Sequence, residues 1–550
     1  MRQAVISMKE VYIGIDIGTG GARVLAVDGS GTLVAQATQE YPLLTPRPGW
    51  TEQNPEDWWA ATAACLRRVT VEVGPDRVRG VGLTGQMHGS VFLDDQGQVI
   101  RPALLWNDQR TQAECDEIVA RVGADRLLAL AGNRALTGFT APKVLWLRKH
   151  EPEAYARVRH LLLPKDYLRY RLTGEYATDV SDASGTLLLD VAARRWSEPI
   201  LAALEIDPGI LPRLAEGPEV TGYVTPAAAA ETGLPAGIPV VGGGGDQAAN
   251  AVGVGLVSEG AASLALGTSG VVFAATRQPG HVRTGYSVGA NRRDGAATCA
   301  AGAGSPDPAQ VVAPPGLPQD SLSTVHSFCH AVPGMWHVMG VMLSSGGSLR
   351  WLRDSLYARD AAEDRQAGRE PYDRITGEAA TVPAGAEGLL FLPYLTGERV
   401  PHPDPSARGA FIGIGLQHTR AHFARAVMEG IAFGLRDNLD LIRALGVNVT
   451  ELRITGGGSR SPLWRTILAA ALGVPLRRMA VDEGPAFGAA ILAATGTGAY
   501  PDVAAACAAM VRTGDAVPVD AELEARYAAL LPLFRQAYVQ LKPLFPQLVS

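Results

Sequence analysis

Two strand–turn–strand units with similar turns lie far apart in this chain of 550 residues. Val11 to Val27 contains a buried strand, a Gly-Thr-Gly-Gly turn at Gly18 to Gly21 and a returning strand, and Ala261 to Ala275 repeats the pattern around Gly267 to Gly270. Each strand has the short, β-branched and apolar composition that strands favour. The repeat predicts two related α/β halves, which meet near Gly253 to Gly260.

The length supports the same division, because one hydrophobic core rarely serves a chain of this size. Hydrophobic residues make up 47% and charged residues 19%, which is typical of a folded protein. We predict helices over Trp58 to Val71, Ala421 to Ile442 and Phe487 to Ala494. Arg277 to Leu322 has no apolar period and predicts a surface loop, and Asp360 to Asp373 is a shorter polar stretch of the same kind.

The net charge of -6 and the pI of about 6.0 favour neither nucleic acid nor an anionic membrane as a partner. No segment is long and apolar enough to span a bilayer, and the N-terminus resembles no signal peptide. Five scattered cysteines predict neither a disulfide framework nor a zinc knuckle, so a cytoplasmic location is expected. The sequence leaves the oligomeric state open, with a homodimer among the alternatives.

The turn that follows Asp16 is a candidate phosphate site. Backbone N–H groups at Gly18, Thr19 and Gly20 could surround phosphate oxygens, with the Thr19 hydroxyl as a further donor and Arg23 as a cation. Asp16, at the strand end, could face Mg²⁺ directly or through water. The alternative is a plain hairpin turn. No Gly-Lys-Ser/Thr follows, so the turn is not a Walker loop.

Four glycines lead into Asp246 at the start of a small-residue helix. A carboxylate there could act as a base toward a substrate hydroxyl, while the alternative is a helix N-cap, a common role for Asp. Two further Gly-rich turns are candidate nucleotide sites, since such turns and the helix N-termini after them can hold anions. Their residues are Gly267 and Thr268 in one turn, and Gly456, Gly457, Gly458 and Ser461 in the other.

Polar groups after apolar runs in the first half are candidate sugar contacts. An indole suits the C–H face of a sugar, and Asn and Asp suit its hydroxyls. The candidates are Met87, His88, Trp106, Asn107 and Asp108. The alternatives are core packing for Trp106 and a structural role for His88.

These motifs, in this order, resemble the FGGY carbohydrate kinases, and within that family the xylulokinases. The resemblance runs from Val11 to nearly the end of the chain and is interrupted at Arg277 to Leu322. It includes GIDIGTGG, GQMHG, LLWNDQR, GFTAPKVLWL, LLPKDYLRYRLTGE, SDASGT, GGGGDQAA, LGTSGV, VHSFCHA, FLPYLTGERVPH and GPAFGAA. Gly20 departs from the family pattern, because a hydroxyl residue is expected there.

The resemblance implies an α/β fold of two ribonuclease H-like, actin-like ATPase domains with the active site in the cleft between them. It implies a sugar-binding domain at 1–257 and a nucleotide-binding domain at 258–550, with 277–322 as a loop insertion. It also implies that Asp246 is the general base for transfer of phosphate from ATP, with Mg²⁺, to D-xylulose. The alternatives are a kinase for another sugar or polyol, such as ribulose or gluconate, and a non-catalytic actin-like regulator.

Overall fold

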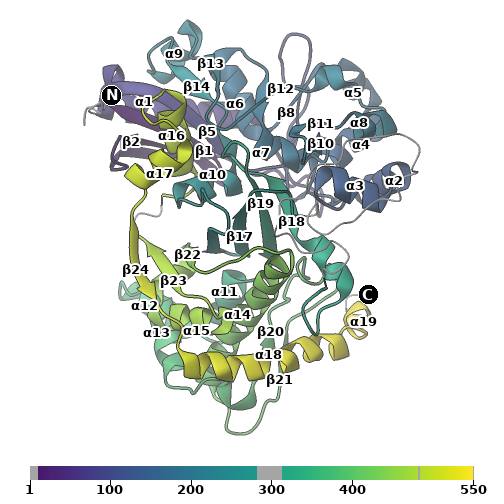
Figure 1. Cartoon of the computed structure of the whole chain (residues 1–550), viewed down its shortest axis with the longest axis vertical. Helices are drawn as coiled ribbons and strands as arrows, with labels where there is room; N and C mark the ends of the chain where they lie inside the picture. The colour runs from purple at the N-terminus through teal and green to yellow at the C-terminus, as the bar shows by residue number, and fades with distance from the viewer. Residues whose placement is uncertain (1–9, 281–311, 481–482, 549–550) are drawn as a thin grey trace, which may run out of the picture.

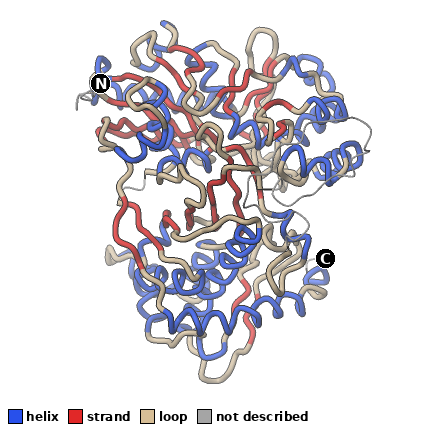
Figure 2. The backbone as a smooth tube through the Cα atoms, viewed as in Figure 1, coloured by secondary structure: helices blue, strands red, loops and turns tan. Residues whose placement is uncertain are grey.

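The computed structural model describes residues 10–280, 312–480 and 483–548. Two seven-stranded mixed sheets organise these residues, one in each half of the chain. Figure 1 shows the first half as the upper body and most of the second half as the lower one, and Figure 2 shows the helices gathered around the strands of both.

The first sheet has the order β13-β14-β5-β1-β2-β3, and β15 pairs with β5. The strands β1, β2 and β3 form the predicted antiparallel meander, and β5 pairs with β1 in parallel. Every residue of β1 except Asp16 is fully buried, which explains its unbroken apolar sequence. The bounds are β1 Val11–Ile17, β2 Gly21–Asp28, β3 Leu33–Glu40, β5 Val78–Gly85, β13 Val220–Tyr223, β14 Pro239–Val241 and β15 Gly244–Gly245.

The second sheet has the order β18-β19-β17-β16-β22-β23-β24. The unit predicted as a repeat, β16 followed by β17, is antiparallel like β1 and β2, and β22 lies parallel to β16. The expected duplication is therefore present in the pairing of the strands. The bounds are β16 Ala262–Leu266, β17 Gly270–Thr276, β18 His326–Cys329, β19 Trp336–Met342, β22 Leu452–Thr455, β23 Leu476–Met479 and β24 Thr513–Val517.

Helices cover the sheets, and the described part of the chain also contains five two-stranded sheets. The predicted long helix is confirmed as α14, whose apolar side is buried in the core of the second half. The helices are α1 Pro55–Val73, α2 Gln112–Val122, α3 Ala124–Ala131, α4 Thr140–His150, α5 Pro152–Arg157, α6 Pro164–Thr173, α7 Val180–Ala183, α8 Glu198–Leu204, α9 Pro226–Thr232, α10 Asp246–Gly253, α11 Gly346–Ser355, α12 Ala358–Gln366, α13 Pro371–Ala380, α14 Arg420–Ala444, α15 Pro462–Leu472, α16 Pro485–Gly496, α17 Val503–Met510, α18 Ala521–Leu541 and α19 Phe545–Leu548.

The chain returns to the first half near its end. In Figure 1 the yellow helices α16 and α17 lie among the purple and teal elements of the upper body, and α16 packs on β1, β5 and α10. Glycines permit this contact: a Cβ atom on Gly82 would lie 1.9 Å from the Ala489 carbonyl oxygen, and one on Gly488 would lie 1.7 Å from the Ala249 carbonyl oxygen. These two glycines therefore serve the close packing of α16 and not a turn.

One of the two expected loops differs from the prediction. Asp360 to Asp373 contains α12 and the start of α13, and the buried Asp364 carboxylate accepts hydrogen bonds from Arg369 and Arg374. This pairing gives a polar segment a fixed position without an apolar period. The other expected loop, Arg277 to Leu322, lies mostly outside the described residues, at 281–311, and Leu317 and Leu322 near its end are buried in the core.

The four cysteines among the described residues are buried and unpaired, and Cys299 lies outside that part of the chain. None of the described helices has the length and apolar character needed to cross a membrane.

Candidate active site

Strand pairing brings Asp16 and Asp246 to one edge of the first sheet. β5 lies between β1 and β15, and Thr84 of β5 is the partner of both Asp16 and Gly244. Both neighbouring strands run parallel to β5, so their carboxyl ends meet at the same edge. Gly244 and Gly245 lead directly into Asp246, so the two carboxylates lie on either side of the end of β5.

Asp246 is the first residue of α10, and its predecessor Gly245 is the N-cap. The alternative role of Asp246 as the helix N-cap is therefore wrong, because the N-cap lies one residue earlier. One carboxylate oxygen of Asp246, Oδ1, accepts the backbone N–H of Gln247 at 2.7 Å. That bond orients the carboxylate at the start of α10.

Burial raises the pKa of both carboxyl groups. Burial raises the pKa of Asp246 to about 7, and repulsion from Asp16 adds to this effect, while the hydrogen bond from Gln247 opposes it. Burial also raises the pKa of Asp16 to about 6, against the attraction of Arg23. A carboxylate that titrates near neutral pH is suited to accept a proton from a hydroxyl.

The first predicted phosphate turn is held by side chains from distant segments. The Thr19 hydroxyl donates to Gln86 Oε1 at 3.1 Å and accepts the indole N–H of Trp106 at 3.0 Å. Arg23 donates to Gln36 Oε1 at 2.7 Å and forms an ion pair with Glu483, just before α16. A side chain at Gly20 would meet nothing within 4 Å, so the space for the missing hydroxyl is open.

Met87 and His88 lie beside the base. The site of a Cβ on Gly245 would be 2.9 Å from Met87 Cγ, so the Met87 side chain covers the backbone just before Asp246. The His88 Nδ1 atom is 2.7 Å from the Gly185 carbonyl oxygen, and because a carbonyl only accepts, Nδ1 carries the hydrogen. Burial lowers the pKa of His88 to about 3, so the ring is neutral and its Nε2 is an acceptor.

Trp106, Asn107 and Asp108 differ in their surroundings. Trp106 is 40% exposed, which excludes core packing as its role. Asn107 accepts the Thr51 hydroxyl at 2.7 Å. Asp108 is fully buried, and both its oxygens accept hydrogen bonds from Arg110, one of them also from the Thr51 N–H. The carboxylate of Asp108 therefore supports the loop, and Trp106 presents its indole.

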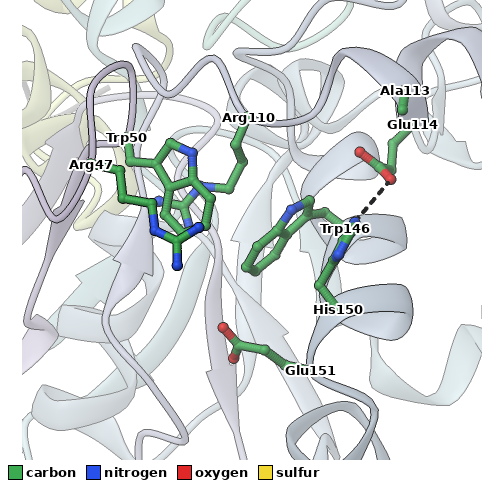
Figure 3. A pocket seen from close by; sticks show the side chains of 8 residues that line it. All are labelled: Arg47, Trp50, Arg110, Ala113, Glu114, Trp146, His150 and Glu151. Atoms are coloured by element: carbon green, nitrogen blue, oxygen red, sulfur yellow. Dashed lines mark ion pairs between the residues drawn. The ribbon is translucent and has the colours of Figure 1, made fainter.

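A cavity of about 600 Å³ lies next to this loop, and Figure 3 shows its lining. The Arg110 guanidinium lies 3.7 Å from the ring centre of Trp50 and 4.8 Å from that of Trp146. None of the lining residues is a predicted site residue. They are Arg47, Trp50, Arg110, Ala113, Glu114, Trp146, His150 and Glu151.

We expect Arg110→Ala to lower the free energy of unfolding by about 3–5 kcal/mol, because it leaves the buried Asp108 carboxylate without its cation. Urea unfolding measures the change. Arg47→Ala is the control, since Arg47 is exposed and stacks on the same Trp50 ring at 4.8 Å. Equal urea midpoints for the two variants would contradict the role assigned to Arg110.

The other two predicted nucleotide turns adjoin each other at the edge of the second sheet. β16 and β22 are parallel neighbours, and a Cβ on Gly456 would lie 2.5 Å from the Leu266 carbonyl oxygen. The N–H groups of Gly346 and Gly347, at the start of α11, donate to the carbonyls of Gly267 and Thr268 at 2.9 Å. The three turns thus form two groups, one at the end of each sheet.

Ser461 and Gly457 have different surroundings in the third turn. Ser461 is the N-cap of α15, and its hydroxyl accepts the Trp464 N–H at 3.3 Å. A side chain at Gly457 would meet nothing within 4 Å, so the backbone there is open to a ligand. Gly458 instead lies under the Trp464 ring.

Several residues of the site have no distinctive signal in the sequence. Gln86 and Gln53 connect Thr19 to Trp58, and only their positions within matching motifs could have indicated them. The backbone N–H of Arg399 donates to Glu398 Oε1 at 2.7 Å, whereas its guanidinium makes no hydrogen bond or ion pair with the described residues. Together with Lys143, the charge of Arg399 further lowers the pKa of His88. The motif GERVPH contains Arg399, but nothing in the local pattern separates it from a surface arginine.

Comparison with known proteins decides the family. The model of the N-terminal domain of the FGGY family of carbohydrate kinases matches residues 11–253, and that of the C-terminal domain matches 317–497. The chain belongs to the FGGY family of carbohydrate kinases. The resemblance found in the sequence is therefore confirmed, and the FGGY kinase transfers a phosphoryl group to a sugar hydroxyl.

Named relatives cover nearly the whole FGGY chain. The xylulose kinase of Escherichia coli strain K12 is 39% identical over 97% of this chain and 100% of its own. That of Klebsiella pneumoniae is 40% identical over 88% of this chain and 89% of its own. A crystal structure described as a xyloylose kinase from Brucella ovis matches with a TM-score of 0.83 at 36% identity, covering 97% of this chain and 100% of that one. These matches confirm the two-domain, actin-like α/β fold.

Proposed function

We propose that this FGGY kinase transfers the γ-phosphate of ATP to D-xylulose and releases ADP and D-xylulose 5-phosphate. The xylulose kinases that align along almost its full length support this substrate. The observation that carries the mechanism is Asp246, a carboxylate with one oxygen bonded to the helix and a pKa near 7. Residues 1–257 would bind the sugar, and 258–550 would bind most of the nucleotide.

Asp246 accepts the proton of the sugar hydroxyl as that oxygen approaches the phosphorus atom. The neutral His88 accepts a hydrogen bond from another hydroxyl, and the exposed Trp106 indole packs against the sugar. Arg399 offers a cation from the second half, on the His88 side. Together these groups orient the sugar toward Asp246.

Asp16 is the proposed magnesium residue. Mg²⁺ in kinases is bound by one or two carboxylates together with phosphate oxygens. Two carboxylates that repel each other at one sheet edge fit such an ion, and no larger cluster of metal-ligating side chains occurs among the described residues. When bound, Mg²⁺ would neutralise charge on the transferring phosphoryl group. The turns at Gly267 and Gly456 would contact the nucleotide through their backbone.

A panel of sugars tests the substrate. The FGGY kinase should turn over D-xylulose with a higher kcat/KM than ribulose, gluconate, xylitol or arabitol in an assay that couples ADP release to NADH oxidation. Equal or faster turnover of another sugar would overturn the assignment of D-xylulose as the substrate. Absence of turnover with every sugar would favour the alternative of a non-catalytic regulator. A homodimer and a cytoplasmic location stay predictions.

The rate should depend on pH through Asp246. The base must be ionised to accept a proton, and burial raises its pKa to about 7. We therefore expect kcat/KM to be constant above about pH 8 and to fall about tenfold per pH unit well below pH 7. Below about pH 6, protonation of Asp16 makes the fall steeper. A kcat/KM that stays constant down to pH 5 would contradict the role of Asp246 as the base.

A further inference from the structure

A fully buried charged cluster lies directly behind the glycines that precede Asp246. The Lys165 Nζ atom is 2.6 Å from Asp166, 2.9 Å from Asp179 and 3.1 Å from Asp182, and all four side chains are 0% exposed. Burial opposes the charge on Lys165, but the three carboxylates raise its pKa above the ordinary value, so it remains a cation. Nothing in the proposed mechanism uses this cluster.

One branch of the cluster reaches the peptide before the base. The Asp179 carboxylate accepts the hydroxyl hydrogen of Ser181 and, at 2.7 Å, its backbone N–H. With its hydrogen used in this way, the Ser181 oxygen is oriented as an acceptor, and it accepts the N–H of Gly245 at 3.1 Å. Gly245 is the N-cap of α10, and Asp246 follows it.

A second cation fixes the start of the same glycine run. Arg169 is fully buried and donates to the carbonyl oxygens of Val241 and Gly242, each at 2.6 Å. The run is therefore bound at both ends, by Arg169 at its carbonyls and by Ser181 at its last N–H. Glycines have no side chains that could be fixed by packing, so polar contacts to the backbone must determine the path of the segment.

We propose that a network of three residues positions Asp246 for phosphoryl transfer by fixing the Gly245 amide. This network, called the Ser181 network, consists of Lys165, Asp179 and Ser181. Lys165 holds the Asp179 carboxylate, Asp179 orients the Ser181 hydroxyl, and Ser181 holds the first turn of α10. These are positioning residues, since none of them lies where it would touch the sugar or ATP. The inference rests on the proposed role of Asp246 as the base.

Ser184 supplies a matched control for Ser181. It is also fully buried, three residues further along, and its hydroxyl accepts the backbone N–H of Cys329 at 3.2 Å. Ser181→Ala and Ser184→Ala each remove one buried hydroxyl and leave one buried N–H without its acceptor. Each also removes one donated hydrogen bond, to the Asp179 carboxylate from Ser181 and to the Ser181 carbonyl oxygen from Ser184. Only Ser181→Ala releases Gly245, so the comparison separates positioning of the base from loss of stability.

We expect Ser181→Ala to lower kcat about tenfold to hundredfold relative to Ser184→Ala, with the KM for ATP unchanged, because small displacements of a reacting group have effects of this size. The acid limb of the pH profile should also move below pH 7, since a freed Asp246 gains water and its pKa falls toward the ordinary value. Thermal unfolding should shift equally in both variants. If Ser181→Ala does not fold, Asp179→Asn carries the same test.

Equal losses of kcat in Ser181→Ala and Ser184→Ala, with the acid limb unmoved, would overturn the inference. Asp246→Asn is assayed alongside. If Asp246→Asn is inactive while the two serine variants have equal kcat, the positioning role of the Ser181 network is wrong and the role of Asp246 as the base stands. If Asp246→Asn keeps wild-type turnover, the proposed base fails, and the positioning role fails with it.

Discussion

Asp246→Asn should lower kcat for D-xylulose phosphorylation by about 10²–10⁴-fold, the range that a general base contributes. Asparagine has nearly the same shape, and its amide oxygen can still accept the Gln247 N–H that Asp246 Oδ1 accepts at 2.7 Å. The variant therefore keeps the start of α10 and loses the group that takes the proton. Steady-state ADP release measures kcat, and calorimetric titration with D-xylulose should show binding within a few-fold of wild type.

Asp207→Asn is the control for Asp246→Asn. Asp207 is an exposed N-cap whose Oδ1 accepts the Gly209 N–H at 2.8 Å, so it has a similar hydrogen bond at a distant helix start. Its substitution should leave kcat unchanged. An Asp246→Asn enzyme with kcat within about threefold of wild type would contradict the role of Asp246 as the general base. So small a loss lies far below the contribution that a general base makes to the rate.

The second large effect concerns the contact between the halves of the chain. Gly82→Ala should lower the free energy of unfolding by about 3 kcal/mol or more, because overpacking a closed core forces the backbone apart. A Cβ atom on Gly82 would lie 1.9 Å from the Ala489 carbonyl oxygen and 2.6 Å from its carbon, and these are backbone atoms that no rotamer change can move. α16 would have to shift away from β5. The urea midpoint measures the loss.

Gly377→Ala is the control for Gly82→Ala. Gly377 lies on the exposed side of α13, where a Cβ atom would meet nothing within 4 Å. Alanine there should leave stability unchanged or raise it by up to about 1 kcal/mol, since glycine is the poorer helix former. If Gly82→Ala unfolds at the wild-type urea midpoint, the packing of α16 on β5 is looser than the structure implies.

Much of the architecture was predictable from local pattern. β1, β2, α1 and α14 were predicted from apolar runs and helical periods, which depend only on neighbours in sequence. α12 was missed, since the ion pairs of Asp364 with Arg369 and Arg374 give no apolar period. The alternative role of Asp246 as a helix N-cap was wrong, because the N-cap is Gly245, one residue earlier. The first residue of a helix depends on backbone angles, and the sequence predicts that position only to within a few residues.

By itself, the sequence determined the two strand–turn–strand units, the Gly-rich turns and the family, because these depend on local composition and on the order of motifs. Tertiary structure decided what each residue meets. It placed Asp16 and Asp246 on either side of β5, where burial raises both pKa values and repulsion from Asp16 raises that of Asp246 further. It also placed Ser181 behind Gly245. Such contacts join residues far apart in the chain, so they depend on the packing of the whole fold.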